Sequence, residues 1–293
     1  MNYRTDLAVE CTENTAGAKN GLRWTEDFDG DVKIIRVFVE NEDGARAIGK
    51  PIGQYITIEV PPFGDNADVP GIGMERVATE LRALLPPIGA ILVVGLGNRD
   101  ITPDALGPKT VSQVMATRHI SGELARSAGM GDLRQVVCLQ PGVLGRTGME
   151  SSELIGAAVG KLDPAAVVTV DALASRRLSR LGCTVQIADS GIVPGSGVGN
   201  ARAEINAACM GVPVFSIGVP TVVDAATLAA DLTNGANRPL CLREEIDPAV
   251  AQMMVTPREV DLLIERAARM LAMAINRALQ PHLEVDDFLM MTE

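Results

Sequence analysis

The sequence has few of the residues on which common catalytic mechanisms depend. It contains only two histidines, His119 and His282, and its five cysteines are scattered without a CxxC pair. A histidine-dependent mechanism therefore has one of two residues to use, and the dispersed, odd-numbered cysteines indicate reduced thiols in a cytosolic compartment. No G-x-S-x-G motif occurs, which argues against a serine hydrolase of that class.

Long apolar segments and basic clusters are also missing. No uncharged apolar run reaches the ~20 residues of a membrane span, and residues 1–6 lack the apolar core of a signal peptide. Lysine and arginine total 26 against 37 acidic residues, which gives a formal net charge of -11. A nucleic-acid surface requires clustered basic residues. We therefore expect a cytoplasmic protein with no direct nucleic-acid binding and no membrane association.

The chain does have a regular alternation of apolar strands and helical patterns. Its 293 residues, 47% of them hydrophobic, are enough to bury a large core. Predicted strands at 91–94, 135–139, 165–171, 183–188 and 213–218 alternate with helical segments, which is typical of an α/β fold. We expect a mostly parallel twisted sheet with helices on both faces. Two earlier strands, at 33–39 and 54–60, predict an extra N-terminal β region.

The helical segments are less sharply bounded than the strands. We expect helices at 74–85, 110–117, 151–162, near 201–210 and at 256–279. The last begins with Thr256-Pro-Arg-Glu259, which is typical of a capping box with proline at the first helical position. Residues 1–30 have no periodic pattern and predict an arm, and 233–252 predicts a polar excursion.

One stretch places an acid where α/β proteins carry out their chemistry. The buried run from Ile91 to Val94 ends in Gly95-Leu-Gly-Asn98, and the following loop contains Asp100 and Asp104. Gly107-Pro108 then begins a helix, where the missing N–H of proline is tolerated. A carboxylate is thus expected on a tight loop at the carboxyl end of a strand, which is where open α/β sheets bind ligands.

A second acid leaves the same predicted edge of the sheet. The strand at 165–171 is apolar until its last residue, Asp171. Two acids in one cleft cannot both ionise without a large cost in free energy, so one keeps a proton while the other activates a water. Asp104 and Asp171 are therefore candidates for the catalytic pair of an acid-dyad hydrolase. The alternative is that they cap helices or brace loops.

Other motifs do not support a cofactor. The stretch beginning at Gly156 is one residue short of a phosphate loop and has Leu162 where serine or threonine would bind magnesium. Asp100 occupies the position of the third glycine that a dinucleotide fingerprint requires. We expect no cofactor, and we assign structural roles to Asp100, Asp189 and Asp224.

Nine blocks of the sequence match one known family, in order and over nearly the whole chain. They are Arg4-Thr-Asp-Leu-Ala-Val-Glu10, Val93-Val-Gly-Leu-Gly-Asn98, Thr102-Pro-Asp-Ala-Leu-Gly-Pro-Lys109, Pro141-Gly-Val143, Val170-Asp-Ala-Leu-Ala174, Asp189-Ser-Gly-Ile192, Pro194-Gly-Ser-Gly-Val-Gly-Asn200, Pro220-Thr-Val-Val-Asp-Ala225 and Met254-Val-Thr-Pro-Arg-Glu-Val-Asp261. In these blocks the chain resembles the germination proteases of spore-forming bacteria. Chance does not produce such an ordered series.

The resemblance implies an activity, a self-processing step and an oligomeric state. It implies a single α/β peptidase domain at 7–293 behind a short propeptide at 1–6, made as a self-processing zymogen and assembled as a homotetramer. Germination proteases are regarded as atypical aspartic endopeptidases that begin the degradation of small acid-soluble spore proteins in the forespore or spore core. The family's candidate catalytic acids fall on Asp104 and Asp171. The family cuts after an acid and before an apolar residue followed by alanine, so Asp6–Leu7 is the implied processing bond.

Two departures from the family pattern and two alternatives stay open. The N-terminal extension and the segment between Asp224 and Met254 are both shorter than expected. The fold also resembles that of hydrogenase-maturation endopeptidases, which hold a metal with two acids and a histidine. A metal-dependent endopeptidase with Asp104 and Asp171 as ligands is therefore one alternative, although His119 has no histidine in a matching third position. A non-catalytic binding protein on this fold is the other.

The resemblance also implies how a substrate is recognised. An apolar pocket is expected to accept the side chain after the cut, and a basic group to pair with the acid before it. Arg118, Arg146 and Lys109 lie near the right loops and are the candidates for this basic group.

Overall fold

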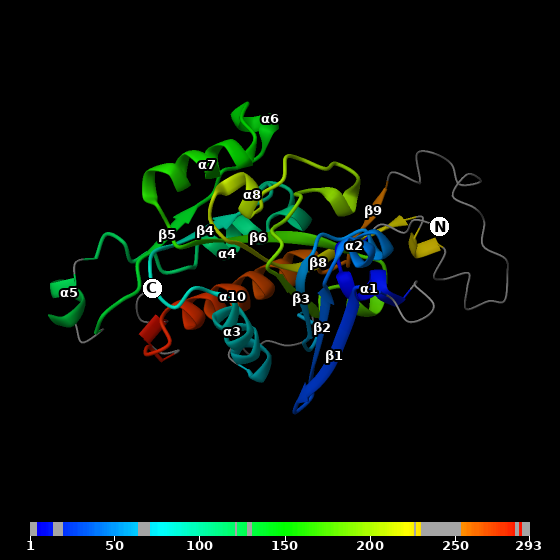
Figure 1. The fold of residues 1–293 in the computed structure, drawn as a ribbon, viewed down its shortest axis with the longest axis horizontal. Coiled ribbons are helices and arrows are strands. Elements are labelled where there is room, and N and C mark those ends of the chain that lie inside the picture. The colour runs from blue at the N-terminus through cyan, green and yellow to red at the C-terminus, as the bar shows by residue number, and fades with distance from the viewer. Residues whose placement is uncertain are drawn as a thin grey trace.

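One β-sheet runs through the molecule in the strand order β1-β2-β3-β7-β8-β6-β4-β5, with β9 paired to β8 (Figure 1). The computed structural model describes residues 5–13, 20–63, 71–120, 122–127, 131–225, 227–229, 253–284 and 287–288. The strands are β1 (Leu22–Asp29), β2 (Val32–Val39), β3 (Gly53–Glu59), β4 (Ile91–Gly95), β5 (Val136–Leu139), β6 (Ala166–Ser175), β7 (Thr184–Ala188), β8 (Val214–Asp224) and β9 (Met254–Val255).

Helices and short 3-10 turns connect these strands. The α-helices are α1 (Ala8–Glu13), α2 (Glu42–Ile48), α3 (Ile72–Leu84), α4 (Leu106–Val111), α5 (Gly122–Ser127), α6 (Leu144–Thr147), α7 (Ser151–Leu162), α8 (Ala207–Met210) and α10 (Val260–Leu279). The 3-10 turns are η1 (Thr102–Asp104), η2 (Leu178–Arg180) and η3 (Ser196–Val198).

The sheet is mixed, and its two halves differ in strand direction. β8, β6, β4 and β5 pair in parallel, whereas β1, β2, β3 and β7 pair antiparallel with their neighbours. The predicted α/β class and the N-terminal β region are confirmed, but the parallel part covers only one half. β7 runs antiparallel because only residues 176–183 separate it from β6, which is too short for the crossover that a parallel strand requires.

Helices cover both faces of the parallel half. Along β4, Ile91 and Val93 belong to the large core cluster under α3 and α10, whereas Leu92 and Val94 belong to the cluster under α7. This alternation is the period of two expected for a strand buried on both sides. Figure 1 shows α3 and α10 on one side of the sheet and α7 and α8 on the other.

The N-terminal residues are built into the fold, so the predicted arm is wrong for the described part of 1–30. Leu7 and Ala8 are completely buried, in a cluster with residues of β2 and β3 such as Val37 and Tyr55. β1 pairs along its whole length with β2. Neither feature has a local periodic signal, because each depends on contacts with distant strands.

Several predicted helix boundaries also differ from the structure. The helix expected at 110–117 lies at Leu106–Val111, and the one expected near 201–210 is reduced to Ala207–Met210. The capping box at residue 256 does not form, because α10 begins at Val260 and the Thr256 hydroxyl instead donates to the Thr221 carbonyl (3.1 Å). The predicted excursion at 233–252, like most of the shortened segment after Asp224, lies outside the described residues.

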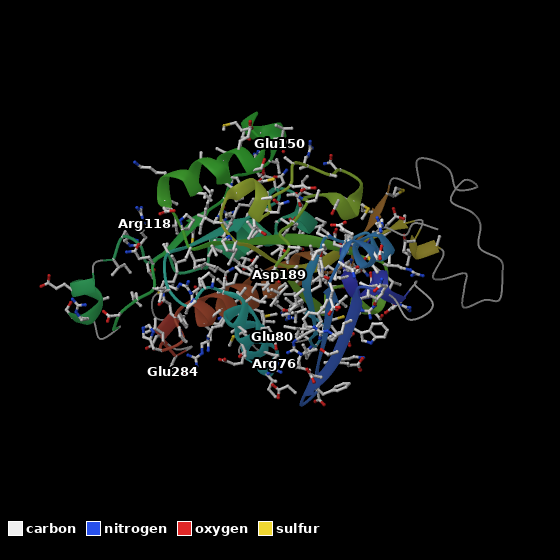
Figure 2. The ribbon with its side chains drawn as sticks, in the orientation of Figure 1. Arg76, Glu80, Arg118, Glu150, Asp189 and Glu284 are labelled. Carbon is white, nitrogen blue, oxygen red and sulfur yellow. The ribbon has the colours of Figure 1, made fainter. Side chains whose placement is uncertain are left out.

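A buried ion-pair group joins the N-terminal strands to α3. Glu80 on α3 accepts from Arg36 of β2 at 2.6 Å and lies 3.4 Å from Arg76, one turn earlier (Figure 2). Only 9% of the Glu80 side chain is exposed. These charges are paired where water does not reach them well, so removal of one partner would leave the others without compensation.

Two sequence-based expectations concern features spread over the chain. In the ranges that the structure describes, no helix combines the length and apolarity needed to cross a membrane. Cys11, Cys138, Cys183 and Cys209 are free thiols, as predicted for them, and Cys241 lies outside the described residues.

Candidate active site

The loop after β4 holds Asp104 at the end of η1. The Asn98 N–H donates to Asp104 Oδ2 at 2.7 Å, so the carboxylate is fixed by the same turn that ends the strand. The Thr221 hydroxyl donates to the Pro103 carbonyl at 2.8 Å and ties this loop to β8. Asp104 is therefore held from both its own loop and a neighbouring strand.

Gly97 makes this close packing possible. Its φ of +105° lies in the region that side chains with a Cβ rarely adopt, and a Cβ there would lie 2.1 Å from the Asp104 carbonyl oxygen. Gly97 is thus required by the backbone that supports Asp104.

Asp171 is positioned by β6. It lies within the strand, which continues to Ser175, so the prediction that Asp171 ends the strand is wrong. Its side chain is only 6% exposed, and the N–H of Ala172 donates to Asp171 Oδ1 at 2.9 Å. β6 pairs in parallel with β4, which places Asp171 just beyond the end of β4 and close to the Asp104 loop.

The two predicted acids line the same cavity, which has a volume of about 560 Å³. Burial raises the pKa of Asp171 well above its usual range, and the negative charges of Asp104 and Asp6 raise it further against a smaller opposing effect of the Ala172 N–H. Burial also raises the pKa of Asp104, and the Asn98 N–H partly offsets this. The geometry therefore brings together two interacting acids, of which Asp171 holds its proton more strongly.

The wall around the acids is largely apolar. Side chains from the loops after β4, β5 and β7 contribute Ile101, Val143, Leu144, Pro194 and Val198. Such a surface can bury an apolar side chain of a bound peptide beside the two carboxyl groups.

The implied processing bond lies at this cavity. Asp6 lines it together with Asp104 and Asp171, and the Asp6 N–H donates to the Ala174 carbonyl at 2.8 Å. Leu7 on the other side of the bond is completely buried. The structure therefore places the bond against β6, the strand that carries Asp171.

The three basic candidates for substrate recognition do not line the cavity. Arg146 pairs with Asp100 at 2.6 Å, and Lys109 pairs with Glu265 at 3.1 Å. Figure 2 shows Arg118 well away from the centre of the molecule.

Arg202 does line the cavity, at the end of the glycine-rich segment after β7. Sequence reasoning missed it because the residues that follow the glycine-rich block were read as helix.

Two of the acids that were assigned structural roles make local contacts consistent with that assignment. Asp189 Oδ1 accepts from the Gln54 N–H at 2.7 Å, which links the end of β7 to β3. Asp224 Oδ1 accepts from the N–H and the hydroxyl of Thr227 at 2.9 and 3.0 Å. Both carboxylates therefore satisfy backbone donors near chain turns.

The donor set beside Asp104 and Asp171 does not fit a protein-held metal ion. His119 and His282 are exposed, and neither lines the cavity. Across the part of the chain that the structure describes, no three His, Cys, Asp or Glu side chains are grouped so as to hold an ion. Transition-metal sites in proteins typically use three or more protein ligands, so we derive no catalytic step through a metal.

Comparison with known proteins shows the family to which the chain belongs. The sequence model of the family described as germination protease matches residues 4–235. The germination protease of Clostridium perfringens is 40% identical, with 98% of each chain covered. That of Caldanaerobacter subterraneus is 41% identical, over 97% of this chain and 96% of the relative, and that of Priestia megaterium is 34% identical, over 98% and 96%. The chain is therefore an endopeptidase. It belongs to the germination protease family.

A solved structure gives a weaker likeness. The NiFe hydrogenase maturation protease HycI of Thermococcus kodakarensis KOD1 superposes with a TM-score of 0.36 and 18% identity, covering 67% of this chain and 98% of that one. At that level the likeness carries no argument about the site.

Proposed function

We propose that the chain begins the degradation of small acid-soluble spore proteins during germination, in the spore core, by an acid-dyad mechanism. It cuts after Glu or Asp and before an apolar residue followed by alanine. The observation that carries this proposal is the single cavity lined by Asp104 and Asp171, in which burial and the charge of Asp104 raise the pKa of Asp171. Membership of the germination protease family supports the substrate class.

The two acids have different roles in the proposed reaction. Asp104, ionised and fixed by the Asn98 N–H, takes a proton from a water that attacks the carbonyl carbon of the peptide. Asp171 donates its proton to the carbonyl oxygen, so the intermediate carries two hydroxyl groups. When the C–N bond breaks, the proton on Asp104 passes to the leaving nitrogen and one hydroxyl returns its proton to Asp171. The pair thus ends the cycle in its starting state.

The proposal includes self-processing. Residues 1–6 form the propeptide, cleavage at Asp6–Leu7 releases it, and residues 7–293 form the mature peptidase domain, which assembles as a homotetramer. The position of Asp6 in the cavity of the two acids supports this assignment of the cut.

Replacement of each acid by its amide tests the mechanism. General acid–base catalysis contributes about 10²–10⁴ in rate, so Asp104→Asn and Asp171→Asn are each expected to lower kcat for a spore-protein substrate by about 10³. Asp163→Asn is the control, because Asp163 is an exposed C-cap residue of α7 outside the cavity. Full activity in either Asp104→Asn or Asp171→Asn would exclude the dyad.

Chelation separates this mechanism from the metal-dependent alternative that uses the same two acids. We expect EDTA to leave the rate of peptide cleavage unchanged. A loss of activity that added metal restores would favour the metal-dependent enzyme.

A further inference from the structure

The geometry points to a substrate-recognition site formed by Ser196, the Ala174 N–H and Gln186. The chain's own residues 6–8 occupy this site. In this assignment Ser196 and the Ala174 N–H bind the acidic side chain before the cut, and Gln186 binds the peptide backbone on both sides of it. The inference rests on the proposed cleavage at Asp6–Leu7 and adds the residues that recognise the bond.

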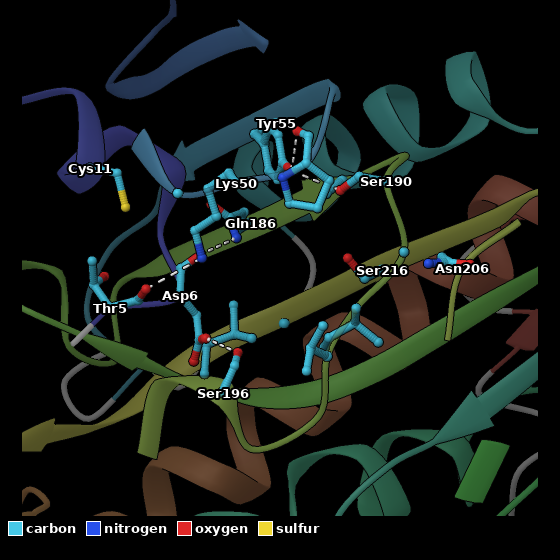
Figure 3. Close-up of a pocket in the computed structure, with 18 of the residues that line it drawn as sticks. Thr5, Asp6, Cys11, Lys50, Tyr55, Gln186, Ser190, Ser196, Asn206 and Ser216 are labelled. Carbon is cyan, nitrogen blue, oxygen red and sulfur yellow. Dashed lines mark hydrogen bonds between the residues drawn. The ribbon is translucent and has the colours of Figure 1, made fainter. Parts of the chain in front are cut away.

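Neutral donors bind the Asp6 carboxylate. The Ala174 N–H donates to Asp6 Oδ2 at 2.8 Å. The Ser196 hydroxyl donates to Asp6 Oδ1 at 3.0 Å (Figure 3). Each carboxylate oxygen therefore has a donor, and hydrogen bonds to an ionised group are stronger than those between neutral partners. An amide in place of Asp6 would accept from the Ala174 N–H and donate its NH₂ group to the Ser196 hydroxyl, so both bonds would join neutral groups and be weaker than those to the carboxylate. The pair therefore favours an acid over its amide through bond strength.

Gly197 leaves the space that the acid occupies. A Cβ at this position would lie 2.0 Å from Asp6 Oδ2 and 2.6 Å from its Cγ. The glycine-rich segment after β7 thus brings its backbone against the carboxylate, with Ser196 supplying the hydroxyl. This gives a function to part of a glycine-rich block that helix or strand packing does not require.

Gln186 on β7 forms hydrogen bonds to the backbone on both sides of the Asp6–Leu7 bond. Its Nε2 donates to the Asp6 carbonyl at 2.9 Å (Figure 3). Its Oε1 accepts from the Ala8 N–H at 2.8 Å. The Asp6 carbonyl is the one that water attacks in the proposed cut. Gln186 is 7% exposed, so this side chain is buried with both of its polar atoms committed to residues 6 and 8. A donor aimed at that oxygen also stabilises the negative charge that develops on it.

The remaining contacts fit a peptide in which an acidic residue is followed by an apolar and then a small residue. Leu7 and Ala8 are both completely buried in the cluster that includes Val37, Tyr55 and Leu173. Asp6 also lines the cavity of Asp104 and Asp171. The site therefore holds one side chain of each kind, and the first of them, Asp6, is the one that reaches the cavity of the two acids.

A double-mutant cycle on self-cleavage of the full chain tests the assignment, with intact mass reporting the cut at Asp6–Leu7. We expect Asp6→Asn to slow self-cleavage about tenfold in the wild-type background but by a clearly smaller factor beside Ser196→Ala, since one of the two bonds to the carboxylate is then gone and the Ala174 N–H bond remains. Ser196→Thr should restore the dependence on the acid. Gln186→Leu should slow the wild-type and Asp6→Asn chains by the same factor, because Gln186 contacts only the backbone.

Two controls make the outcome interpretable. Ser179→Ala, at an exposed serine of η2, should leave the rate unchanged, and thermal unfolding identifies any variant that has lost its fold. Additive effects of Asp6→Asn and Ser196→Ala would overturn the assignment, and so would a wild-type chain that cuts peptides but never cuts itself at Asp6–Leu7. A chain that cuts neither itself nor a peptide with the acid, apolar, alanine sequence would instead refute the proposed function.

Discussion

The fold buries the carboxyl group of Asp171 in a place where its ionised form is unfavourable. Burial first, and then the charges of Asp104 and Asp6, raise its pKa well above the ordinary value of 3.8. Below that ordinary value the folded and unfolded chains both carry the proton, so the group has no effect on stability. As the pH rises, the unfolded chain ionises first, and this favours unfolding until the folded group also ionises.

Asp171→Asn should therefore stabilise the protein at neutral pH. The amide has no proton to lose in the unfolded chain, so the free energy of unfolding is expected to rise at pH 7. The gain should disappear near pH 3. Urea unfolding at the two pH values measures it, with Asp163→Asn as the matched control. A variant that is equally stabilised at both pH values would show that the effect does not come from ionisation.

At the scale of single residues, the sequence allowed the two acids to be singled out but not their partners. Asp104 and Asp171 each follow an apolar run in the sequence, which is a local pattern. Ser196 and Gln186 carry no such signal, because their roles depend on the N-terminal residues packing against β6 and β7. The basic residues proposed for substrate recognition follow from proximity in sequence, which does not reveal the ion pairs of Arg146 with Asp100 and of Lys109 with Glu265.

At the scale of elements, apolar runs predicted the strands of the parallel half well, whereas directions and ends were less predictable. An apolar run stops at Asp171, yet β6 continues to Ser175 because β8 offers a long parallel partner. The direction of β7 depends on the length of its connection to β6, not on its own residues. The start of α10 was misplaced because Thr256 hydrogen-bonds to β8 instead of capping the helix.

The contact between α3 and the N-terminal strands should depend on Glu80. Glu80→Ala leaves the partly buried guanidinium groups of Arg36 and Arg76 without this carboxylate, and breaking a buried pair in this way destabilises proteins by about 3–5 kcal/mol. Because Arg36 also has Asp27 as a partner, we expect about 3 kcal/mol from urea unfolding. The exposed pair of Arg46 and Asp43 is the matched control, and Arg46→Ala should cost about 0.5 kcal/mol or less. Equal losses in the two variants would contradict the role given to burial.

At the scale of the whole molecule, the α/β class and the extra N-terminal β region were predictable because each needs only the order of local patterns. The assembly of the N-terminal residues into the sheet was not. Leu7 packs with residues of β2, β3 and β6, which come from three separate parts of the chain, so no window of sequence contains the cluster. The mixed character of the sheet has the same origin, since it follows from how distant strands meet.

The burial of Leu7, directly after the Asp6 that lines the cavity of the acid pair, has a kinetic consequence. A bond already held inside the molecule that cuts it needs no encounter between molecules, so its disappearance should follow a single exponential. Its half-time should stay the same when the protein is diluted a hundredfold, and an excess of the Asp104→Asn chain should not be trimmed by the active one at a comparable speed. Mass spectrometry of timed samples measures both quantities. A half-time that lengthens on dilution would mean that one molecule trims another.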